Sequence, residues 1–456
     1  MHHRSKLTFA ALLAGLTLSL GGCGGGGGGG GTNVAAGTVV DTGGDKAVVT
    51  ITVSAQQEVR AASSDPGQPS GVPLARMRDA VVVGDHILVR SDSAATIQVD
   101  RDLIHPGTRV SALDAQGKFL STHDYGNTLA SNYLGEWAML PMAGGVVMVQ
   151  TGAGSKLFRL DAQGAMVGAA AGIDLYAVQP IDSPLPTVVA SAAAVDGDGF
   201  WYATTLVERP IPNSEKNAIY SMMLVKLDAN GKELTPPFKL TMSTKFLQPR
   251  MVASGGSVLV TWLDSGAPMQ AYWRYGGPRP LVHSVTGTGG GTPDLLPVAM
   301  ASTGKVGMLW NFKVGMTSNL LGVALNDGGN PIIDTARVDL TQETLSDKWG
   351  YSRRDRVSFD ARTAANGSLL IADVVTGRLK PTDPLGDLLL LADYSYGAAP
   401  LSSATMNVLR QRDPGAAPLG QAPILRQMLF ADHAVLLIGD ETHLDTAIVT
   451  RAAAAH

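Results

Sequence analysis

The residues of this chain that are best suited to contact a ligand are aromatic or charged and stand between apolar segments. His123, Asp124 and Tyr125 occupy one such place. An imidazole beside a carboxylate can act as a general base or bind a metal, although such a pair is more often a hydrogen bond within a loop. Aromatic rings beside arginine and aspartate suit a sugar, a peptide or a loop of a partner protein. The candidates for a binding face are His123, Asp124, Tyr125, Trp137, Tyr176, Trp349, Tyr351, Arg353 and Arg354.

Motifs that would assign a reaction are missing from the sequence, so the catalytic residues remain unknown. The glycine-rich stretch at residues 287–292 has the spacing of a dinucleotide-binding loop, but Pro293 follows it and no helix opens there. Residues 196–199, Asp-Gly-Asp-Gly, lack the further acidic ligands of a calcium loop. The charged stretch at residues 353–356 is best interpreted as a solvated cluster. We therefore expect no bound metal and no cofactor.

The elements that must position these residues are predicted by a repeating unit, in which an apolar run, a tight turn and a second apolar run follow one another. Residues 80–90 (AVVVGDHILVR) and 250–262 (RMVASGGSVLVTW) are clear copies. Turn residues such as Gly-Gly, Asp-Gly and Asn-Gly favour hairpins, and nearly continuous apolar runs suit strands buried on both faces. The predicted turns fall near Gly84, Gly145, Gly199, Gly256, Gly304, Gly367 and His433.

A second predicted hairpin follows most of these units, so each unit supplies four strands. Its copies include residues 110–121, 157–168 and 223–234, each with the pattern Leu-Asp-Ala-x-Gly. Four-stranded sheets repeated around an axis are the blades of a β-propeller. The sequence therefore predicts an all-β, seven-bladed β-propeller of four-stranded antiparallel blades. The alternative is eight blades, with an irregular blade in residues 334–356 or 376–410.

This repeat resembles a divergent one that is common in secreted bacterial propellers and lipoproteins. The clearest copies are residues 249–262 and 227–234. The resemblance implies the propeller fold and no particular activity, because propellers host many unrelated functions.

The last unit is one strand short, and an earlier segment is predicted to complete it. Residues 47–54 (AVVTITVS) alternate apolar and polar side chains, as an outer strand does. We expect this segment to pair with the last blade and to close the ring, because an open ring would expose a sheet edge.

Connections within the repeats are short, whereas several of the others are long. In an up-and-down blade, alternate connections emerge on opposite faces. One face is therefore expected to be flat and the other to carry long loops, where binding sites usually lie. The candidate binding residues are expected on that face, near the central axis.

The N-terminal residues have the features of a secretory signal: a basic start, an uncharged apolar run at residues 7–20 and small residues after it. Leu20-Gly21-Gly22-Cys23 resembles the lipobox of bacterial lipoproteins. That resemblance implies that Cys23 carries the lipid, an acyl chain such as palmitate, and that Gly24 in place of aspartate directs the protein to the outer membrane. Whether it faces the periplasm or the exterior stays open. The expected organisation is a signal peptide (1–22), a glycine-rich tether (23–46) and one propeller domain (47–456).

Composition narrows the functions that remain. Cys23 is the single cysteine, so disulfides and thiolate metal sites are excluded. The formal net charge of −4 argues against nucleic acid as a partner. Apart from the membrane at its lipid anchor, we expect a protein or glycan partner and interpret the chain as a binding or assembly scaffold of the cell envelope. The alternative is a propeller enzyme, a lyase or hydrolase, that acts on an envelope or extracellular polymer.

Overall fold

The structure is a computed structural model, and nearly all of the residues that it describes lie in strands or tight turns. It describes residues 37–38, 49–54, 56–61, 74–93, 97–99, 102–104, 107–129, 135–152, 156–168, 172–175, 188–210, 218–243, 247–264, 267–274, 276–277, 280–284, 294–300, 305–314, 317–324, 338–339, 355–363, 369–377, 386–394, 400–406, 424–440 and 442–453. Within them, no helix is long and apolar enough to cross a membrane.

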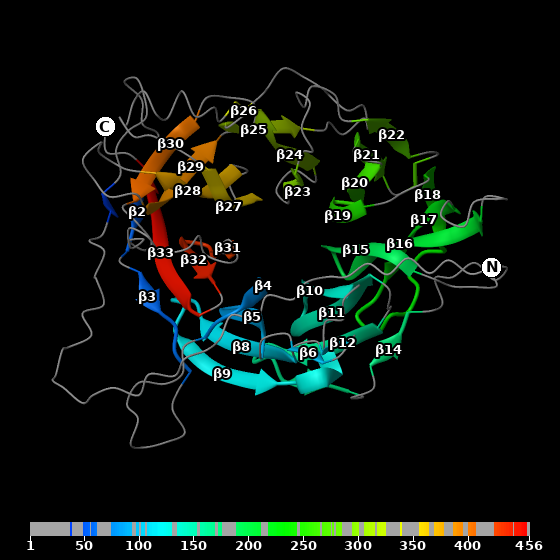
Figure 1. Cartoon of the computed structure of the whole chain (residues 1–456), viewed down its shortest axis with the longest axis horizontal. Coiled ribbons are helices and arrows are strands. Elements are labelled where there is room, and N and C mark those ends of the chain that lie inside the picture. Colours follow the sequence, from blue (N-terminus) through cyan, green and yellow to red (C-terminus); the bar gives the residue numbers. More distant parts are fainter. Residues whose placement is uncertain are drawn as a thin grey trace, which may run out of the picture. The chain divides into compact units, whose positions relative to one another are not determined.

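The strands form antiparallel sheets, most of them four-stranded, that follow one another along the chain (Figure 1). The first three are β4 (Met77–Val83), β5 (His86–Asp92), β8 (Thr108–Asp114) and β9 (Phe119–Asp124); β10 (Gly135–Met142), β11 (Gly145–Gly152), β12 (Lys156–Asp161) and β13 (Met166–Val167), with β14 (Ile173–Asp174) also on β12; and β15 (Val188–Asp196), β16 (Gly199–Pro210), β17 (Ala218–Leu227) and β18 (Phe238–Ser243).

The next three sheets have the same order of strands. They are β19 (Leu247–Ser254), β20 (Ser257–Asp264), β21 (Ala267–Arg274) and β22 (Leu281–Ser284); β23 (Asp294–Met300), β24 (Lys305–Val314), β25 (Thr317–Ala324) and β26 (Val338–Asp339); and β27 (Asp355–Thr363), β28 (Leu369–Gly377), β29 (Gly386–Tyr394) and β30 (Pro400–Met406).

The chain ends in a sheet that also takes strands from its beginning, and we name it the closing sheet. It consists of β31 (Ile424–Leu429), β32 (His433–Gly439), β33 (Leu444–Ala453), β2 (Val49–Val53), β1 (Gly37–Thr38) and β3 (Gln57–Glu58). Outside these sheets lie the two-stranded β6 (Ile97–Val99) and β7 (Asp102–Ile104) and the short 3₁₀ helix η1 (Gly126–Leu129).

Each sheet has one innermost strand, which is the first of its strands along the chain or, in the closing sheet, β31. These innermost strands contact one another in a circuit. β4 contacts β10, β10 contacts β15, and the series continues through β19, β23, β27 and β31 until β31 contacts β4 (Figure 1). Sheets repeated radially about a centre are the architecture of a β-propeller. The all-β fold of repeated four-stranded sheets is thereby confirmed.

The described hairpin turns lie where the repeat predicted them, including β4–β5 at Gly84 and β19–β20 at Gly256. The predicted turns at Gly304 and Gly367 lie outside the described residues. The second turns share one hydrogen-bond pattern: the Asp114 carboxylate accepts bonds from the backbone N–H groups of Gln116 and Lys118, at 2.9 and 2.8 Å. Gly117 then takes a φ of +79°, and a Cβ there would lie 2.9 Å from Thr446 of the closing sheet. Glycine is therefore required both by the turn and by the close approach of the neighbouring sheet.

The predicted closing strand is confirmed as β2. It pairs antiparallel with β33, with Val53 opposite Val449. Ile51 and Val53 are fully buried while Thr52 is exposed, which is the alternation that the sequence predicted. β1 then pairs with β2 through Gly37 and Thr38, so the expected tether contains two residues that belong to the sheet.

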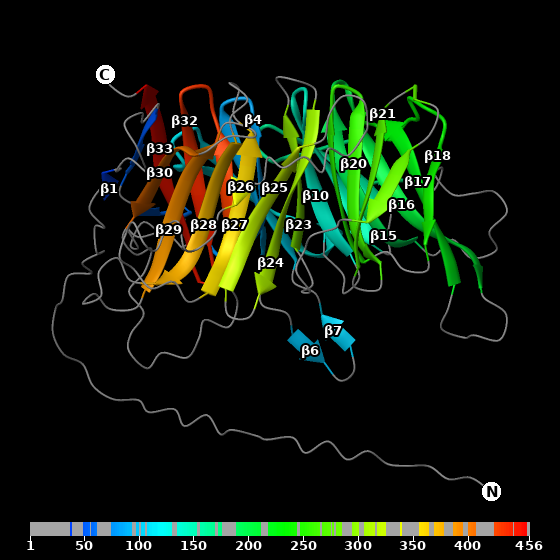
Figure 2. The ribbon, with the colours of Figure 1, turned by 90° about the horizontal axis from the view of Figure 1, so that it is seen from above.

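The strand order also confirms that the long connections share one face. Because the strands of each sheet alternate in direction, the connection from β5 to β8 and that from β9 to β10 emerge opposite the tight turns. Figure 2 shows β6 and β7, which lie within the first of these connections, projecting beyond the ends of the sheet strands.

The alternative of a hidden eighth blade is narrowed but not settled. In residues 376–410 the described strands β29 and β30 complete the sheet of β27 and β28 and do not form another sheet. Of residues 334–356, the structure describes only β26 and the start of β27. The blade count therefore remains a prediction.

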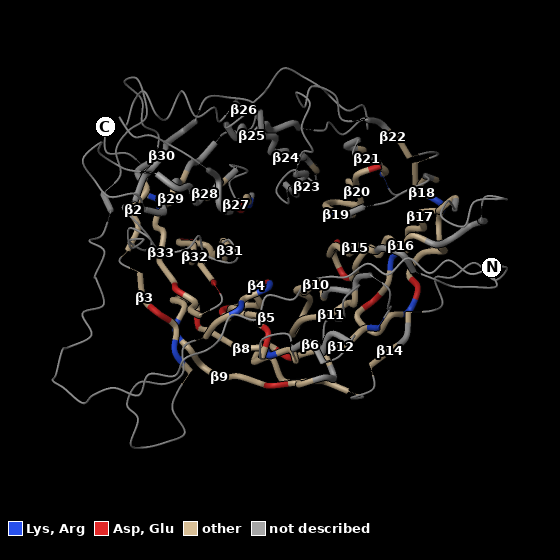
Figure 3. Tube along the Cα trace, viewed as in Figure 1, with Lys and Arg blue, Asp and Glu red and all other residues tan. Residues whose placement is uncertain are grey.

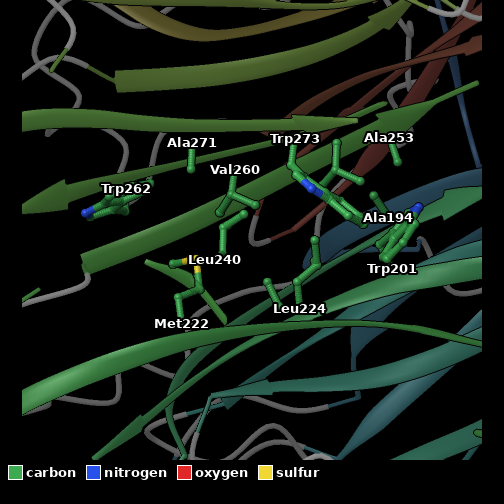
Figure 4. Close-up of a cluster of buried hydrophobic side chains, with 12 residues drawn as sticks. Ala194, Trp201, Met222, Leu224, Leu240, Ala253, Val260, Trp262, Ala271 and Trp273 are labelled. Atoms are coloured by element: carbon green, nitrogen blue, oxygen red, sulfur yellow. The ribbon is translucent and has the colours of Figure 1, made fainter. Parts of the chain in front are cut away.

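An aromatic core lies between two consecutive sheets, β15–β18 and β19–β22, and we name it the aromatic seam (Figure 4). Trp201 meets Trp273 edge to face at 5.5 Å between ring centroids, and Phe238 stacks on Trp273 at 5.0 Å. Trp201 and Trp262 are each only 1% exposed. Both therefore serve in packing.

Candidate functional site

The predicted group His123, Asp124 and Tyr125 lies at the end of β9, the outermost strand of its sheet. The expectation that it would stand near the central axis is therefore wrong. The Asp124 carboxylate accepts a bond from the Gly126 N–H at 2.9 Å and pairs weakly with Arg109, at 3.4 Å. His123 stacks on Tyr125 with 6.3 Å between ring centroids.

Tyr125 connects its sheet to the next one. Its hydroxyl donates a hydrogen bond to the carbonyl of Gly164, in the turn between β12 and β13. Burial, together with the nearby charge of Asp161, raises the pKa of Tyr125 to about 12. The hydroxyl is therefore a fixed donor at ordinary pH, and Tyr125 forms a contact between neighbouring sheets.

Trp137, another predicted binding residue, is part of the core. It belongs to β10, is 4% exposed and meets Phe158 edge to face at 5.5 Å. The sequence analysis expected it on the face that carries the long loops, but β10 begins at Gly135 and places the indole in the apolar layer between two sheets. The other predicted residues, Cys23, Tyr176, Trp349, Tyr351, Arg353 and Arg354, lie outside the described residues.

A charged cluster that the sequence analysis did not identify lies on the innermost strands β4, β27 and β31 of three neighbouring sheets and on β5, which adjoins β4. We name it the inner cluster. Its members are Arg78 and Asp79 of β4, Arg90 and Asp92 of β5, Asp360 and Arg362 of β27, and Arg426 and Gln427 of β31. Figure 3 shows that charged residues occur on inner strands such as β4 as well as on the outer ones. The signal in the sequence was the interruption of apolar runs, as in Phe-Asp-Ala-Arg at residues 359–362.

Asp360 is a buried member of the inner cluster, only 5% exposed. It accepts bonds from the Arg362 Nε at 3.1 Å and from the backbone N–H of Gln427 at 2.7 Å. The Gln427 side chain donates in return to the carbonyls of Asp360 and Leu370, at 2.9 and 3.2 Å. These bonds join β27 and β28 to the closing sheet and satisfy an amide on an edge strand.

Asp79 holds the other side of the inner cluster. It accepts a bond from Arg426 Nε at 3.3 Å and from the Ala80 N–H at 2.9 Å. Its charge also reaches Arg362: the pKa of that guanidinium is raised, mainly by Asp360 and further by Asp79, against the opposing effect of burial. Arg78 and Asp92 form a two-point pair at 2.7 and 2.5 Å. The guanidinium groups are therefore charged and held in place.

This arrangement suits binding better than acid–base catalysis. Asp79, Asp92 and Asp360 each accept a bond from an arginine, so all three carboxylates are engaged in ion pairs. Among the described residues, no group of three or more His, Cys, Asp or Glu side chains could hold a metal ion.

A different contact joins the closing sheet to the β4–β9 sheet through His433. Its Nδ1 lies 2.6 Å from the Asp432 carboxylate and its Nε2 lies 2.6 Å from the Ala115 carbonyl. Both partners are acceptors, so only the doubly protonated ring donates to both. Burial lowers the pKa of His433, but the bonds to Ala115 and Asp432 outweigh it and leave the pKa above its ordinary value of 6.5.

Comparison with known proteins gives only weak likenesses. No protein-family model matches the sequence, and no curated protein matches it either. Among solved structures, YCF48 from Cyanidioschyzon merolae is 10% identical over 82% of this chain and 97% of its own, with a TM-score of 0.43. TolB from Acinetobacter baumannii is 13% identical over 79% of each chain, with a TM-score of 0.32.

An endo-arabinase from Bacteroides thetaiotaomicron is 10% identical over 56% of this chain and 96% of its own, with a TM-score of 0.31. Identities and TM-scores this low give no argument about activity, substrate or partner. The function has to be argued from the residues of this chain.

Proposed function

We propose that this protein is a seven-bladed β-propeller, tethered to the outer membrane of a bacterial envelope by a lipid on Cys23, that binds a protein or glycan partner. The observation that carries the binding role is the inner cluster, in which guanidinium groups are fixed by carboxylates and remain partly exposed. The side chains of Arg78, Arg362 and Arg426 are 35%, 41% and 28% exposed. Fixed, charged and solvent-accessible donors favour recognition of a ligand.

The count of seven blades is supported by the circuit of inner strands. β23 contacts β27 directly, so the innermost strands of these two sheets are neighbours among the described residues. β31 and β4 complete the circuit in the same way.

The anchor is tested by the substitution Cys23→Ser. We expect the variant to lose labelling by a fatty-acid analogue and to fractionate as a soluble protein, because the resemblance to the lipobox assigns Cys23 as the residue that carries the lipid. A variant that still sediments with membranes in high salt would show that the anchor is wrong.

The binding role is tested by comparing Arg426→Ala with Arg109→Ala. The two arginines are matched: their side chains are 28% and 30% exposed, and each pairs with one aspartate, but Arg109 lies on an outer part of its sheet. Each tagged protein is crosslinked in intact cells, and the recovered proteins and glycans are quantified. We expect one species to be recovered with the wild type and with Arg109→Ala and to be lost with Arg426→Ala. Equal recovery with all three proteins would contradict a role for the inner cluster.

A further inference from the structure

Two arginines of the inner cluster have N–H groups that no described residue accepts a bond from. Arg362 donates through Nε to Asp360, and neither of its η nitrogens has a partner among the described residues. Arg426 donates through Nε to Asp79 and through Nη1 to the Leu425 carbonyl, at 2.9 Å, which leaves its Nη2 without a partner in the same set. These donors belong to side chains that are 41% and 28% exposed, so a ligand can reach them.

The way in which Arg362 is held decides what it presents. A guanidinium that is bonded at Nε keeps its two η nitrogens as a planar fork, and that fork matches the two oxygens of an anion. Asp360 fixes the orientation of the fork, because this carboxylate is itself buried and bonded to Gln427. Little side-chain entropy is therefore left to lose when a ligand binds.

The charges of the inner cluster favour a singly charged anion. Arg78, Arg90, Arg362 and Arg426 outnumber the carboxylates of Asp79, Asp92 and Asp360 by one. One carboxylate neutralises that excess, whereas a phosphate monoester, with its charge of about −1.5 to −2, overcompensates it. Asp360 bonds both Arg362 and the backbone N–H of Gln427, which is the chain neighbour of Arg426, so the two arginines lie on inner strands that contact each other.

The backbone around this neighbourhood favours a peptide as the source of the carboxylate. β27 and β31 are the inner edges of their sheets, and an edge strand offers amide groups that an extended chain can pair with. A sugar chain has no regular series of amides with which to do so.

We propose that Arg362 and Arg426 form a binding site for an acidic side chain of an extended peptide segment, with the Arg362 fork holding the carboxylate. This inference rests on the proposed binding function and names the ligand class of the same site. The site predicts that recognition depends on the shape of the guanidinium as well as on its charge.

The test uses the domain without its signal peptide and a fluorescently labelled oligoglutamate peptide, followed by fluorescence anisotropy. We expect Arg362→Gln and Arg426→Gln to weaken binding, the first by about tenfold or more. Arg362→Lys keeps the charge but not the fork, so it should remain several-fold weaker than the wild type. Arg109→Gln, the matched control on the outer part of its sheet, should bind like the wild type. Melting curves show whether each variant is folded. If Arg362→Gln proves to be unfolded, Arg362→Lys still tests the role of the guanidinium fork.

Three results would overturn this inference. The first is that the wild type does not bind oligoglutamate, and the second is that all variants bind it equally. The third is that an oligogalacturonate binds the wild type more tightly than the peptide does and no longer binds Arg362→Gln. The last result would assign the site to an acidic sugar. If the crosslinking experiment still recovers a partner that depends on Arg426 while oligoglutamate does not bind, the peptide assignment fails and the binding function stands. Failure of both experiments removes both.

Discussion

Two junctions between neighbouring sheets are formed by different kinds of side chain. The aromatic seam joins sheets that are consecutive in the chain, and it buries indole and phenyl rings. The junction between the closing sheet and the β4–β9 sheet, here the closing seam, joins the two ends of the chain. Its core is aliphatic, with Met77, Val435 and Leu437, and it is supplemented by the Asp79–Arg426 pair and the His433 contact.

The difference shows that one junction contributes mainly to stability, whereas the other contributes to the choice of the correct neighbouring sheet. Apolar burial gives the aromatic seam its strength but little directionality. The closing seam must select one partner sheet at a long sequence separation, and charged hydrogen bonds require a defined geometry. We therefore expect substitutions in the aromatic seam to lower stability most per residue, and polar substitutions at the closing seam to have smaller effects that depend on conditions.

The largest effect is expected from deletion of residues 49–53, which removes β2. Ile51 and Val53 are fully buried, and β33 loses one of its ladder partners. The free energy of unfolding should fall by about 5 kcal/mol or more, from two buried side chains and the lost strand pairing. Denaturant unfolding of the domain measures this. Deletion of residues 24–31 is the control and should leave the transition unchanged; equal transitions for both deletions would mean that closure does not depend on β2.

Trp201→Ala should follow, with a loss of about 4 kcal/mol, because it leaves a cavity against Trp273 and frees the Asp196 carboxylate from the indole N–H, now bonded at 3.0 Å. Arg426→Ala, at the closing seam, should lose no more than about 1 kcal/mol. Urea titrations of both variants give the comparison. The proposed difference between the two seams is wrong if Arg426→Ala is more destabilising than Trp201→Ala.

Asp360→Ala is expected to lower stability by about 2 kcal/mol, since it leaves the Gln427 N–H and the Arg362 Nε without their acceptor in a buried place. The partly exposed Asp124, which pairs with Arg109, supplies the matched control. Asp124→Ala should change stability by less than about 0.5 kcal/mol. Thermal melts of the two variants decide it, and similar shifts would show that the inner cluster contributes no more than a surface pair.

The smallest effect concerns His433 and depends on pH. Its folded-state pKa lies above its ordinary value of 6.5, so the folded state binds the proton more tightly than the unfolded state. The resulting stabilisation is complete below that ordinary value and is lost as the pH rises through the folded-state pKa. His433→Gln should remove this slope and about 1 kcal/mol of stability at mildly acidic pH. Unfolding curves across the range from acidic to alkaline pH test this; a slope that persists in the variant would place the titration elsewhere.

The fold could be predicted because its signals are local and repeated. Hairpin turns such as those at Gly84 and Gly256 are indicated by glycine between two apolar runs. In β2, the alternation of apolar and polar residues indicated which face is buried. The candidate site could not be predicted in the same way. Asp360 and Gln427 meet only because their sheets are neighbours in the ring, and no spacing in the chain encodes that contact.

Trp137 and Tyr125 failed as binding residues for a related reason. Both stand at the ends of predicted strands, where a shift of one or two residues decides between loop and core. In the structure, β10 begins before Trp137, and the Tyr125 hydroxyl is taken by the Gly164 carbonyl of the next sheet.

The pairing of β2 with β33 also fixes the order in which folding can be completed. β2 is made long before β33, yet Val53 needs Val449 as its partner. Until synthesis reaches that residue, the segment Val-Thr-Ile-Thr-Val is an unpaired strand that other chains can capture. Contacts of such long range also slow folding, because the loop between them must close first. Completion of the ring is therefore the last step for each newly made chain and the one most exposed to aggregation.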